Sequence, residues 1–269
     1  VLLDLVGFAC SIYRRGIPYI RVPTTLLAIV DASVGAKTGI DYFKRRNRLG
    51  SFYPPKETVI DTSFIATQDL REISNGLAEI LKLAIIKDKS LFDLIDQHAE
   101  ELLQTKFQTS DIVNQIIDKS ILGMIEELEP NLWETNLERC VDFGHTFSPM
   151  IEMKNIKTML HGEAVILDCL LSSCIALNRQ LISSDDLKKM FLVVNKCRLL
   201  THHPDFSDLY LLNKSLSDVT RHRNNSQNLP LPVGIGSHKI IKDLTIEEIR
   251  LARETMEEYA REIEHCNSR

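Results

Sequence analysis

Three side chains of this sequence could together bind a metal ion. Glu79 lies within the apolar segment Asn75 to Lys82, and His145 and His161 each stand beside a glycine. One carboxylate and two imidazoles form a ligand set that holds Zn²⁺ and leaves a coordination position open for a substrate. A lone histidine is more often structural, and the spacing of sixteen residues between these two is only moderately specific. The residues alone therefore leave both a metal site and three structural side chains open.

Basic side chains form a second group that could do chemistry. They fall near glycines or in predicted loops, and they are Arg15, Lys37, Arg45, Arg46, Arg48 and Lys82. Lysine and arginine donors near turns suit a phosphoryl group, and Asp31 and Asn47 could hydrogen-bond hydroxyls. The alternatives are a solvated charged loop over residues 44–48 and a surface ion pair between Glu79 and Lys82, which share a helix face. A metal beside a phosphate site would indicate a phosphorylated polyol as the ligand.

The composition is that of a soluble globular protein. The chain has 269 residues, 44% of them hydrophobic and 26% charged, with a net charge of −5, which allows a real core. The acidic balance argues mildly against nucleic-acid binding, and no apolar run approaches the roughly 18 residues of a membrane span. Six cysteines without C-x-x-C spacing predict reduced core thiols, so we expect a cytoplasmic protein.

The elements that must position these side chains change in kind near residue 67. The first part alternates in α/β fashion, with a helix over Leu2 to Arg15, a strand over Ile17 to Val22, a helix or strand over Leu26 to Val30, a turn over Gly35 to Gly39 and a buried strand over Thr58 to Ile60. The remainder predicts helices over Leu70 to Lys87, Ser90 to Gln104, Ser110 to Glu127, Phe147 to Lys154, His161 to Asn178, Ser184 to Lys196 and Thr245 to Glu262. Ser184 is the predicted N-cap of its helix, and Thr245 with Glu248 predicts a capping box. Leu229 to Ile235 contains two prolines and predicts an edge strand or a loop.

The sequence opens inside an apolar run, at Val1-Leu2-Leu3-Asp4, without an initiator methionine. It also lacks the basic n-region of a secretory signal. We therefore expect a piece of a longer protein.

Several stretches resemble the sugar phosphate cyclases, whose founding member is 3-dehydroquinate synthase. The matching stretches are D-L-V-G-F-A (Asp4 to Ala9), Y-R-R-G-I-P (Tyr13 to Pro18), V-P-T-T-L-L-A (Val22 to Ala28), V-D-A-S-V-G-A-K-T-G-I (Val30 to Ile40), N-R-L-G-S-F-Y-P-P (Asn47 to Pro55), the Glu79 segment, G-H-T-F and H-G-E-A-V. The resemblance covers nearly the whole chain and is highly specific. It implies an α/β plus α fold, with residues 1–67 as the remnant of a Rossmann-like NAD domain and residues 68–269 as a helical metal- and substrate-binding domain.

The resemblance also implies roles for individual residues. Zn²⁺, or Co²⁺ in its place, would bind Glu79, His145 and His161. The catalytic residues of the pocket would be Asp31, Lys37, Asn47 and Lys82. The substrate and its phosphate would contact Arg15, Arg46, Lys119, Arg139, Asp142 and His222. NAD would face Asp4, Thr24, Thr25, Thr62 and Thr67. The match at Lys119 is weaker because the segment after it is longer here, and the family arginine near Arg139 is shifted by one position.

The chain departs from 3-dehydroquinate synthase at the pocket. It reads D-F-G-H-T-F-S-P where that enzyme reads N-L-G-H-T-F-G-H, so Asp142 replaces an asparagine and Pro149 a histidine. His222 corresponds to a pocket lysine. A carboxylate in place of an amide and the loss of a lysine would repel a substrate that carries a carboxylate. The chain therefore most resembles the branch that cyclises sedoheptulose 7-phosphate to 2-epi-5-epi-valiolone, with desmethyl-4-deoxygadusol synthase and 3-dehydroquinate synthase as alternatives.

The family mechanism would use one NAD⁺ that is reduced and then regenerated. A substrate hydroxyl on the metal is oxidised, phosphate leaves by β-elimination, the hydride returns, and an intramolecular aldol reaction closes the carbocycle. The expected partner is a small sugar phosphate, without nucleic acid or membrane, and a homodimer is expected. Because the glycine-rich turn of the family would lie before Val1, a truncated, non-catalytic homologue is the alternative of another class.

Overall fold

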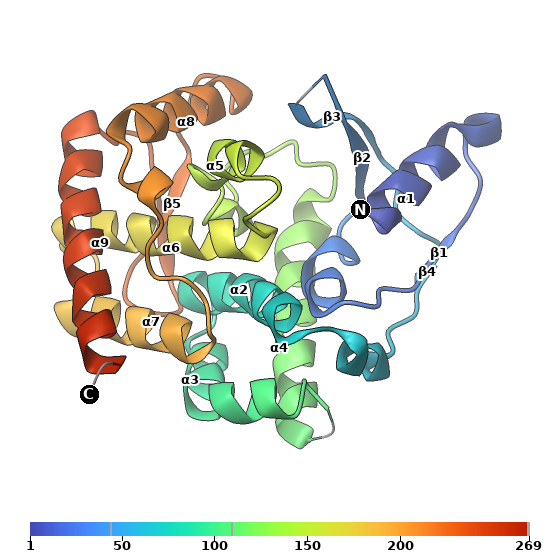
Figure 1. Ribbon diagram of the computed structural model, residues 1–269. Coiled ribbons are helices and arrows are strands. Elements are labelled where there is room, and N and C mark those ends of the chain that lie inside the picture. Colours follow the sequence, from blue (N-terminus) through green and yellow to red (C-terminus); the bar gives the residue numbers. More distant parts are fainter. Residues whose placement is uncertain (44, 109, 268–269) are drawn as a thin grey trace.

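The computed structural model describes residues 1–43, 45–108 and 110–267. A helical body from residue 70 onward lies beside a smaller region of residues 1–67 (Figure 1). The helices of the body are α2 (Leu70–Ile86), α3 (Lys89–Gln104), α4 (Asp111–Leu128), α5 (Ser148–Lys154), α6 (His161–Asn178), α7 (Ser184–Lys196), α8 (Leu209–His222) and α9 (Ile246–Asn267).

Helices α2 and α6 form the centre of the body. Every residue of α6 from Gly162 to Ala176 is buried, as is every residue of α2 from Ile73 to Ile86. A helix that is apolar around its whole circumference is enclosed by other elements. Here α6 packs on α2, α5, α7 and α9, and α2 packs on α3 and α4 as well. The two helices that carry predicted metal ligands therefore lie in the buried centre of the helical body.

The smaller region contains short elements. Helix α1 (Leu2–Ile12) packs on the antiparallel hairpin of β2 (Lys37–Tyr42) and β3 (Arg45–Phe52), and β1 (Ile20–Arg21) pairs in parallel with β4 (Glu57–Thr58). The π-helical turn η2 (Ala28–Ala32) packs against α2 and α4. This turn brings the smaller region into contact with the centre of the body.

The helical predictions are confirmed with small shifts at their ends. The bounds of α6 and α7 agree with the prediction, and the capping box of Thr245 and Glu248 is present. The N-cap of α7 is Ser183 and not Ser184, because the Ser183 hydroxyl accepts the N–H of Asp186. Helix α8 was not predicted, although its buried leucines have helical spacing and Asp208 caps its start.

The predictions for the first 67 residues were less accurate. Helix α1 ends at Ile12, because Arg14 and Arg15 adopt positive φ angles. The predicted strand at residues 17–22 shrinks to β1. The segment at residues 58–60 is not buried, and Lys37 to Gly39 begin strand β2 instead of forming a turn. Strands β1 and β4 pair with each other across a long stretch of intervening chain, so local pattern did not determine their limits. Strand β2 pairs with the adjacent β3 in a hairpin.

The C-terminal half contains one further sheet. Strand β5 (Leu229–Pro232) pairs antiparallel with β6 (His238–Ile241), which confirms a strand within the predicted segment. All four residues of β5 are buried, against α6 and α2. The cysteines whose side chains are described are buried and unpaired, in agreement with the predicted core thiols. Over the residues described, no helix is both long and apolar enough to cross a membrane.

Candidate metal centre

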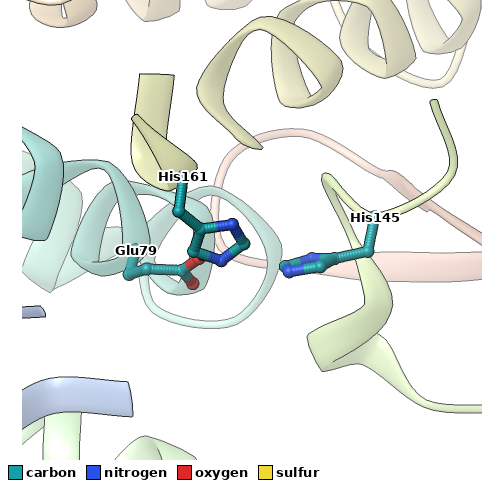
Figure 2. Close-up of side chains that lie close together, drawn as sticks. All are labelled: Glu79, His145 and His161. Atoms are coloured by element: carbon teal, nitrogen blue, oxygen red, sulfur yellow. The ribbon is translucent and has the colours of Figure 1, made fainter. Parts of the chain in front are cut away.

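Glu79, His145 and His161 lie together at the junction of α2, α6 and the loop before α5 (Figure 2). One ligand atom from each residue lies within 4.8 Å of the others, and the two imidazole rings are 5.4 Å apart between centroids. Glu79 comes from the middle of α2, and His161 is the first residue of α6. Because these two helices pack against each other, two ligands are positioned by the core itself.

The carboxylate of Glu79 suits a cation. Both of its oxygens are buried and neither makes a hydrogen bond of good geometry, although the group forms an ion pair with Lys82 and lies 3.2 Å from Nε2 of His161. A buried carboxylate needs a compensating partner. A divalent ion on the side of the imidazoles would provide one, so the residues present fit the predicted metal.

Each imidazole is held through its Nδ1 atom. Nδ1 of His145 lies 3.1 Å from the carbonyl oxygen of Phe143, and Nδ1 of His161 lies 2.9 Å from Oε2 of Glu152. Carbonyl and carboxylate oxygens accept hydrogen bonds, so Nδ1 carries the proton in both rings. The neutral ring of His145 then has its lone pair on Nε2, as a metal ligand requires. Nε2 of His161 is turned to the carboxylate of Glu79, 3.2 Å from its Oε1 atom. Glu152 was not predicted, since nothing in its sequence context links it to His161.

The charges of the site are consistent with this assignment. Burial would raise the pKa of Glu79, but the Lys82 ammonium and the imidazoles outweigh it and hold this pKa well below its usual range. Burial likewise opposes the charge of Lys82, yet Glu79 and Asp31 raise its pKa. Burial and the charge of Lys82 lower the pKa of His145 to about 3. The carboxylate is therefore ionised and the His145 imidazole neutral at neutral pH.

Two predicted pocket residues of the smaller region, Asp31 and Lys37, interact with charged groups of the helical body. Asp31 lies in the turn η2, and its pKa is raised by burial and by the negative charge of Glu79, while Lys82, His161 and Lys37 oppose the rise. The charges of Glu79, Lys82 and His161 therefore act on the Asp31 carboxyl. Lys37, at the start of β2, forms an ion pair of 2.5 Å with Glu134, which follows α4.

A chain of ion pairs continues from Lys37 into the helical body. Glu134 also pairs with Arg139, Arg139 lies 2.7 Å from Asp142, and Asp142 lies 3.1 Å from Arg223. Burial would raise the pKa of Asp142, but the two guanidiniums outweigh it and lower this pKa. Glu134 and Arg223 were not predicted, and both are revealed only by their contacts in the fold.

The predicted His222 lies differently from its neighbour Arg223. The side chain of His222 is 63% exposed and lies 3.6 Å from Asp218 on the same helix. The side chain of Arg223 is only 8% exposed and contacts Asp142. Arg223, and not the predicted His222, therefore contacts the predicted pocket residue Asp142.

Other predicted substrate residues are not brought to the cluster by any described contact. Lys119 lies 3.1 Å from Asp88 and 2.8 Å from the Ser90 hydroxyl. Asn47 and Arg15 are exposed and have positive φ angles. Arg46 belongs to β3, but its side chain lies outside the described residues.

The predicted NAD-facing residues all lie in the smaller region. Asp4 is in the first turn of α1, and Thr24 is exposed. Thr25 accepts the N–H of Ala28 at 3.2 Å. The remaining two, Thr62 and Thr67, are the first and last residues of the 3₁₀ helix η3. Their contact with a cofactor stays a prediction.

Two glycines beside the histidines explain why the ligands approach so closely. A Cβ atom on Gly162 would lie 2.1 Å from the carbonyl oxygen of Asn75, and the N–H of Gly162 donates to Oδ1 of Asn75 at 2.6 Å. Gly144 has a φ of +75°, and a Cβ there would lie 2.6 Å from Sγ of Cys169. Larger residues at either position would separate the elements that carry His161 and His145.

The chain matches known family models over most of its length. The model of the 3-dehydroquinate synthase N-terminal domain matches residues 1–75, and that of the C-terminal domain matches residues 76–221.

Named relatives match at two levels of identity. A 2-epi-5-epi-valiolone synthase of Actinomyces sp is 46% identical over 96% of this chain and 69% of the relative. A demethyl-4-deoxygadusol synthase of Trichormus variabilis is 34% identical over 94% of this chain and 63% of the relative. Across four valiolone synthases that are 44 to 48% identical, the chain spans 62 to 69% of the relative's length.

A solved structure shares the fold. The 2-epi-5-epi-valiolone synthase of Streptomyces hygroscopicus subsp. jinggangensis, with NAD⁺ and Zn²⁺ bound, superimposes with a TM-score of 0.93 at 44% identity. The match covers 96% of this chain and 71% of that one.

Proposed function

Because the chain belongs to the 3-dehydroquinate synthase family, we propose that it is a sugar phosphate cyclase of the valiolone branch. The reaction would convert sedoheptulose 7-phosphate to 2-epi-5-epi-valiolone with loss of phosphate, with NAD and Zn²⁺ or Co²⁺ as cofactors. The observation that carries this proposal is the cluster of Glu79, His145 and His161 in a chain 46% identical to a valiolone synthase.

The metal would be held by the Glu79 carboxylate and by Nε2 of His145 and His161. When bound, the metal would supply a Lewis acid that acidifies a substrate hydroxyl, and NAD would supply a hydride acceptor that later returns the hydride. The chain contributes the preorganisation of this site. Each imidazole has a partner for Nδ1 within the chain, the Phe143 carbonyl for His145 and the Glu152 carboxylate for His161, and such partners orient a ligating ring.

Lys82 and Asp31 would handle charge and protons next to the metal. Lys82 forms the described ion pair with Glu79, so its ammonium is fixed and can donate a hydrogen bond to a substrate oxygen. The raised pKa of Asp31 suits a carboxyl that holds a proton or returns it to a substrate hydroxyl. Lys37, Arg15 and Asn47 would hold the phosphate and hydroxyls.

Asp142 supports a substrate without a carboxylate. Both nearby guanidiniums, of Arg139 and Arg223, are paired with Asp142, and Arg139 is paired with Glu134 as well. A carboxylate substrate would have to compete with these fixed anions. This arrangement favours sedoheptulose 7-phosphate over the substrate of 3-dehydroquinate synthase.

The division into an NAD domain up to residue 67 and a metal domain from residue 68, the homodimer and the cytoplasmic location stay predictions. Light scattering of the purified chain tests the dimer. The predicted contact of Thr25 with NAD is tested by comparing NAD binding of the parent chain and of Thr25→Val, measured by fluorescence. That substitution keeps the shape of the side chain and removes only the hydroxyl that accepts the N–H of Ala28.

The decisive experiment is turnover with identification of the product. Two forms are assayed: the chain alone, and the chain fused to the segment of the Streptomyces relative that the match does not cover. Each form is given NAD⁺ and Zn²⁺ or Co²⁺, with either sedoheptulose 7-phosphate or the carboxylate-bearing substrate of 3-dehydroquinate synthase. Phosphate release together with 2-epi-5-epi-valiolone is expected. Demethyl-4-deoxygadusol as product would assign the sister branch. Turnover only of the carboxylate-bearing substrate would assign a 3-dehydroquinate synthase. Stoichiometric metal binding without any release from either form would leave a non-catalytic homologue.

A further inference from the structure

We propose that Asp168 is a positioning residue that sets the metal ligand His145 in place. This inference rests on the proposed metal site and adds a residue from outside the ligand set. Asp168 lies on α6, seven residues after His161. Seven residues correspond to about two helical turns, so both side chains project from the same face of this helix.

The carboxylate of Asp168 binds the backbone that directly follows His145. Its Oδ2 atom accepts the N–H groups of Thr146, Phe147 and Ser148 at 2.8, 2.6 and 2.8 Å. The residue is fully buried. Three consecutive amides that converge on one oxygen determine the path of the chain at that point, and His145 is the residue from which they continue.

The backbone before and at His145 is held as well. The N–H of His145 donates to the carbonyl of Asp142 at 3.0 Å, and the Ser148 hydroxyl donates to the carbonyl of Gly144 at 2.6 Å. The loop also packs closely on α6, since a Cβ on Gly144 would lie 2.9 Å from the carbonyl oxygen of Val165. With both flanks held, the backbone of His145 is fixed relative to α6, and the contact of Nδ1 with the Phe143 carbonyl orients the ring.

Helix α6 therefore determines the position of both imidazoles. His161 is its own first residue, and His145 is held at a defined distance from α6 through Asp168. Helix α5 links the two histidines a second time. It begins at Ser148, just after His145, and its Glu152 contacts Nδ1 of His161. The separation of the two imidazoles is then a property of the α5–α6 pair.

If position 168 only filled space in the core, an apolar side chain would be expected there. Burial raises the pKa of Asp168, and the three backbone amides oppose that rise. Besides these amides, the Ser172 hydroxyl lies 3.2 Å from its Oδ1. A buried carboxyl group without hydrogen bonds is costly in a core, and here three of its hydrogen bonds come from the backbone that follows His145.

The test is a Co²⁺ titration of the chain and of Asp168→Asn, followed by visible absorption, with folding checked by circular dichroism. An amide keeps the size of the side chain but loses the charge and one acceptor oxygen. We expect Co²⁺ affinity to fall on the order of tenfold or more and the absorption bands to shift, because the His145 nitrogen is displaced. Ser173→Ala is the matched control, since this buried hydroxyl of the same helix bonds only the carbonyl of Cys169 and should change neither readout.

A double-variant cycle shows whether Asp168 acts through His145. In a His145→Ala background, Asp168→Asn should have little further effect on Co²⁺ affinity. A folded Asp168→Asn chain with the parent's affinity and spectrum would overturn the proposal and leave Asp168 a structural residue. An effect of full size in the His145→Ala background would overturn it as well.

A milder variant keeps the proposal testable if Asp168→Asn does not fold. Ser172→Ala removes only the hydroxyl on the other oxygen of Asp168, and a smaller shift of the same bands is expected. Unchanged bands would then count against the proposal. A parent chain that bound no Co²⁺ at all would overturn the metal site itself, which is a separate result from loss of the positioning role.

Discussion

The helical body and the smaller region of residues 1–67 differ in how they are stabilised. In the body, α2 and α6 bury nearly all of their residues against neighbouring helices. In the smaller region, apolar side chains of α1 remain in contact with solvent, with Leu2 74% and Leu5 47% exposed. The three proposed metal ligands lie in the body, whereas the predicted pocket residues Asp31 and Lys37 belong to the smaller region.

This difference leads us to expect that the two regions contribute to different steps, metal binding and turnover. A site built on a dense core keeps its geometry without its ligands. A region held by short strands and a few cross-region contacts can adjust to a bound molecule. Metal binding should therefore depend on the body alone, and turnover on both regions.

The largest effect is expected for Glu79→Ala. This change removes a metal ligand and leaves the ammonium of Lys82, only 3% exposed, without its partner. We expect 1:1 Zn²⁺ binding to be lost and the free energy of unfolding to fall by about 3–5 kcal/mol, as measured by equilibrium dialysis and urea unfolding. The double variant Glu79→Ala/Lys82→Met should recover most of the stability but no metal. Retention of metal by Glu79→Ala would contradict the assigned ligand set.

Lys37→Met should separate turnover from metal binding. The side chain is 59% exposed and pairs with Glu134 across the two regions, so stability should change by less than about 1 kcal/mol. Loss of a donor to the substrate phosphate should lower kcat by roughly 10²–10³ in the form that turns over. Metal affinity should be unchanged, and the exposed Lys56 provides the control as Lys56→Met. A fall in metal affinity would show that the regions are not independent.

Glu152→Ala should weaken the metal site without unfolding the protein. Its carboxylate holds Nδ1 of His161, and loss of such a partner typically costs about 10- to 100-fold in metal affinity. Competition with a chromophoric chelator measures the change, and Glu152→Gln should restore part of it. Glu126→Ala, at a side chain 67% exposed, is the matched control. Equal affinities for the parent and Glu152→Ala would disprove the orienting role.

The smallest effect is expected for Leu5→Ala on the exposed face of α1. A half-exposed leucine contributes little, so the free energy of unfolding should change by about 0.5 kcal/mol or less. Leu167→Ala, at a fully buried position of α6, should cost about 2–5 kcal/mol. Urea unfolding of both variants gives the comparison, and similar losses at the two positions would contradict the contrast between the regions.

Prediction from the sequence succeeded where the signal was local. The limits of α6 and α7 follow from apolar residues at helical spacing and from caps a few residues away. Glu79, His145 and His161 were predicted from short motifs to bind a metal together, and their ligand atoms lie close to one another in the structure. The limits of the short strands β1 and β4 were predicted incorrectly. They depend on the pairing of the two strands with each other, across 35 residues or more of intervening chain.

The sequence by itself therefore determined the types of the proposed ligands, the helices that carry two of them and the family resemblance. Only the tertiary structure decided which nitrogen of each histidine contacts Phe143 or Glu152, and so which one is left for the proposed metal. It also decided that Arg223, and not His222, contacts Asp142. The same holds for Asp168, which binds the amides after His145 from about twenty residues away. The physical reason is that side-chain orientation and hydrogen-bond partners depend on how distant segments pack, which local spacing does not encode.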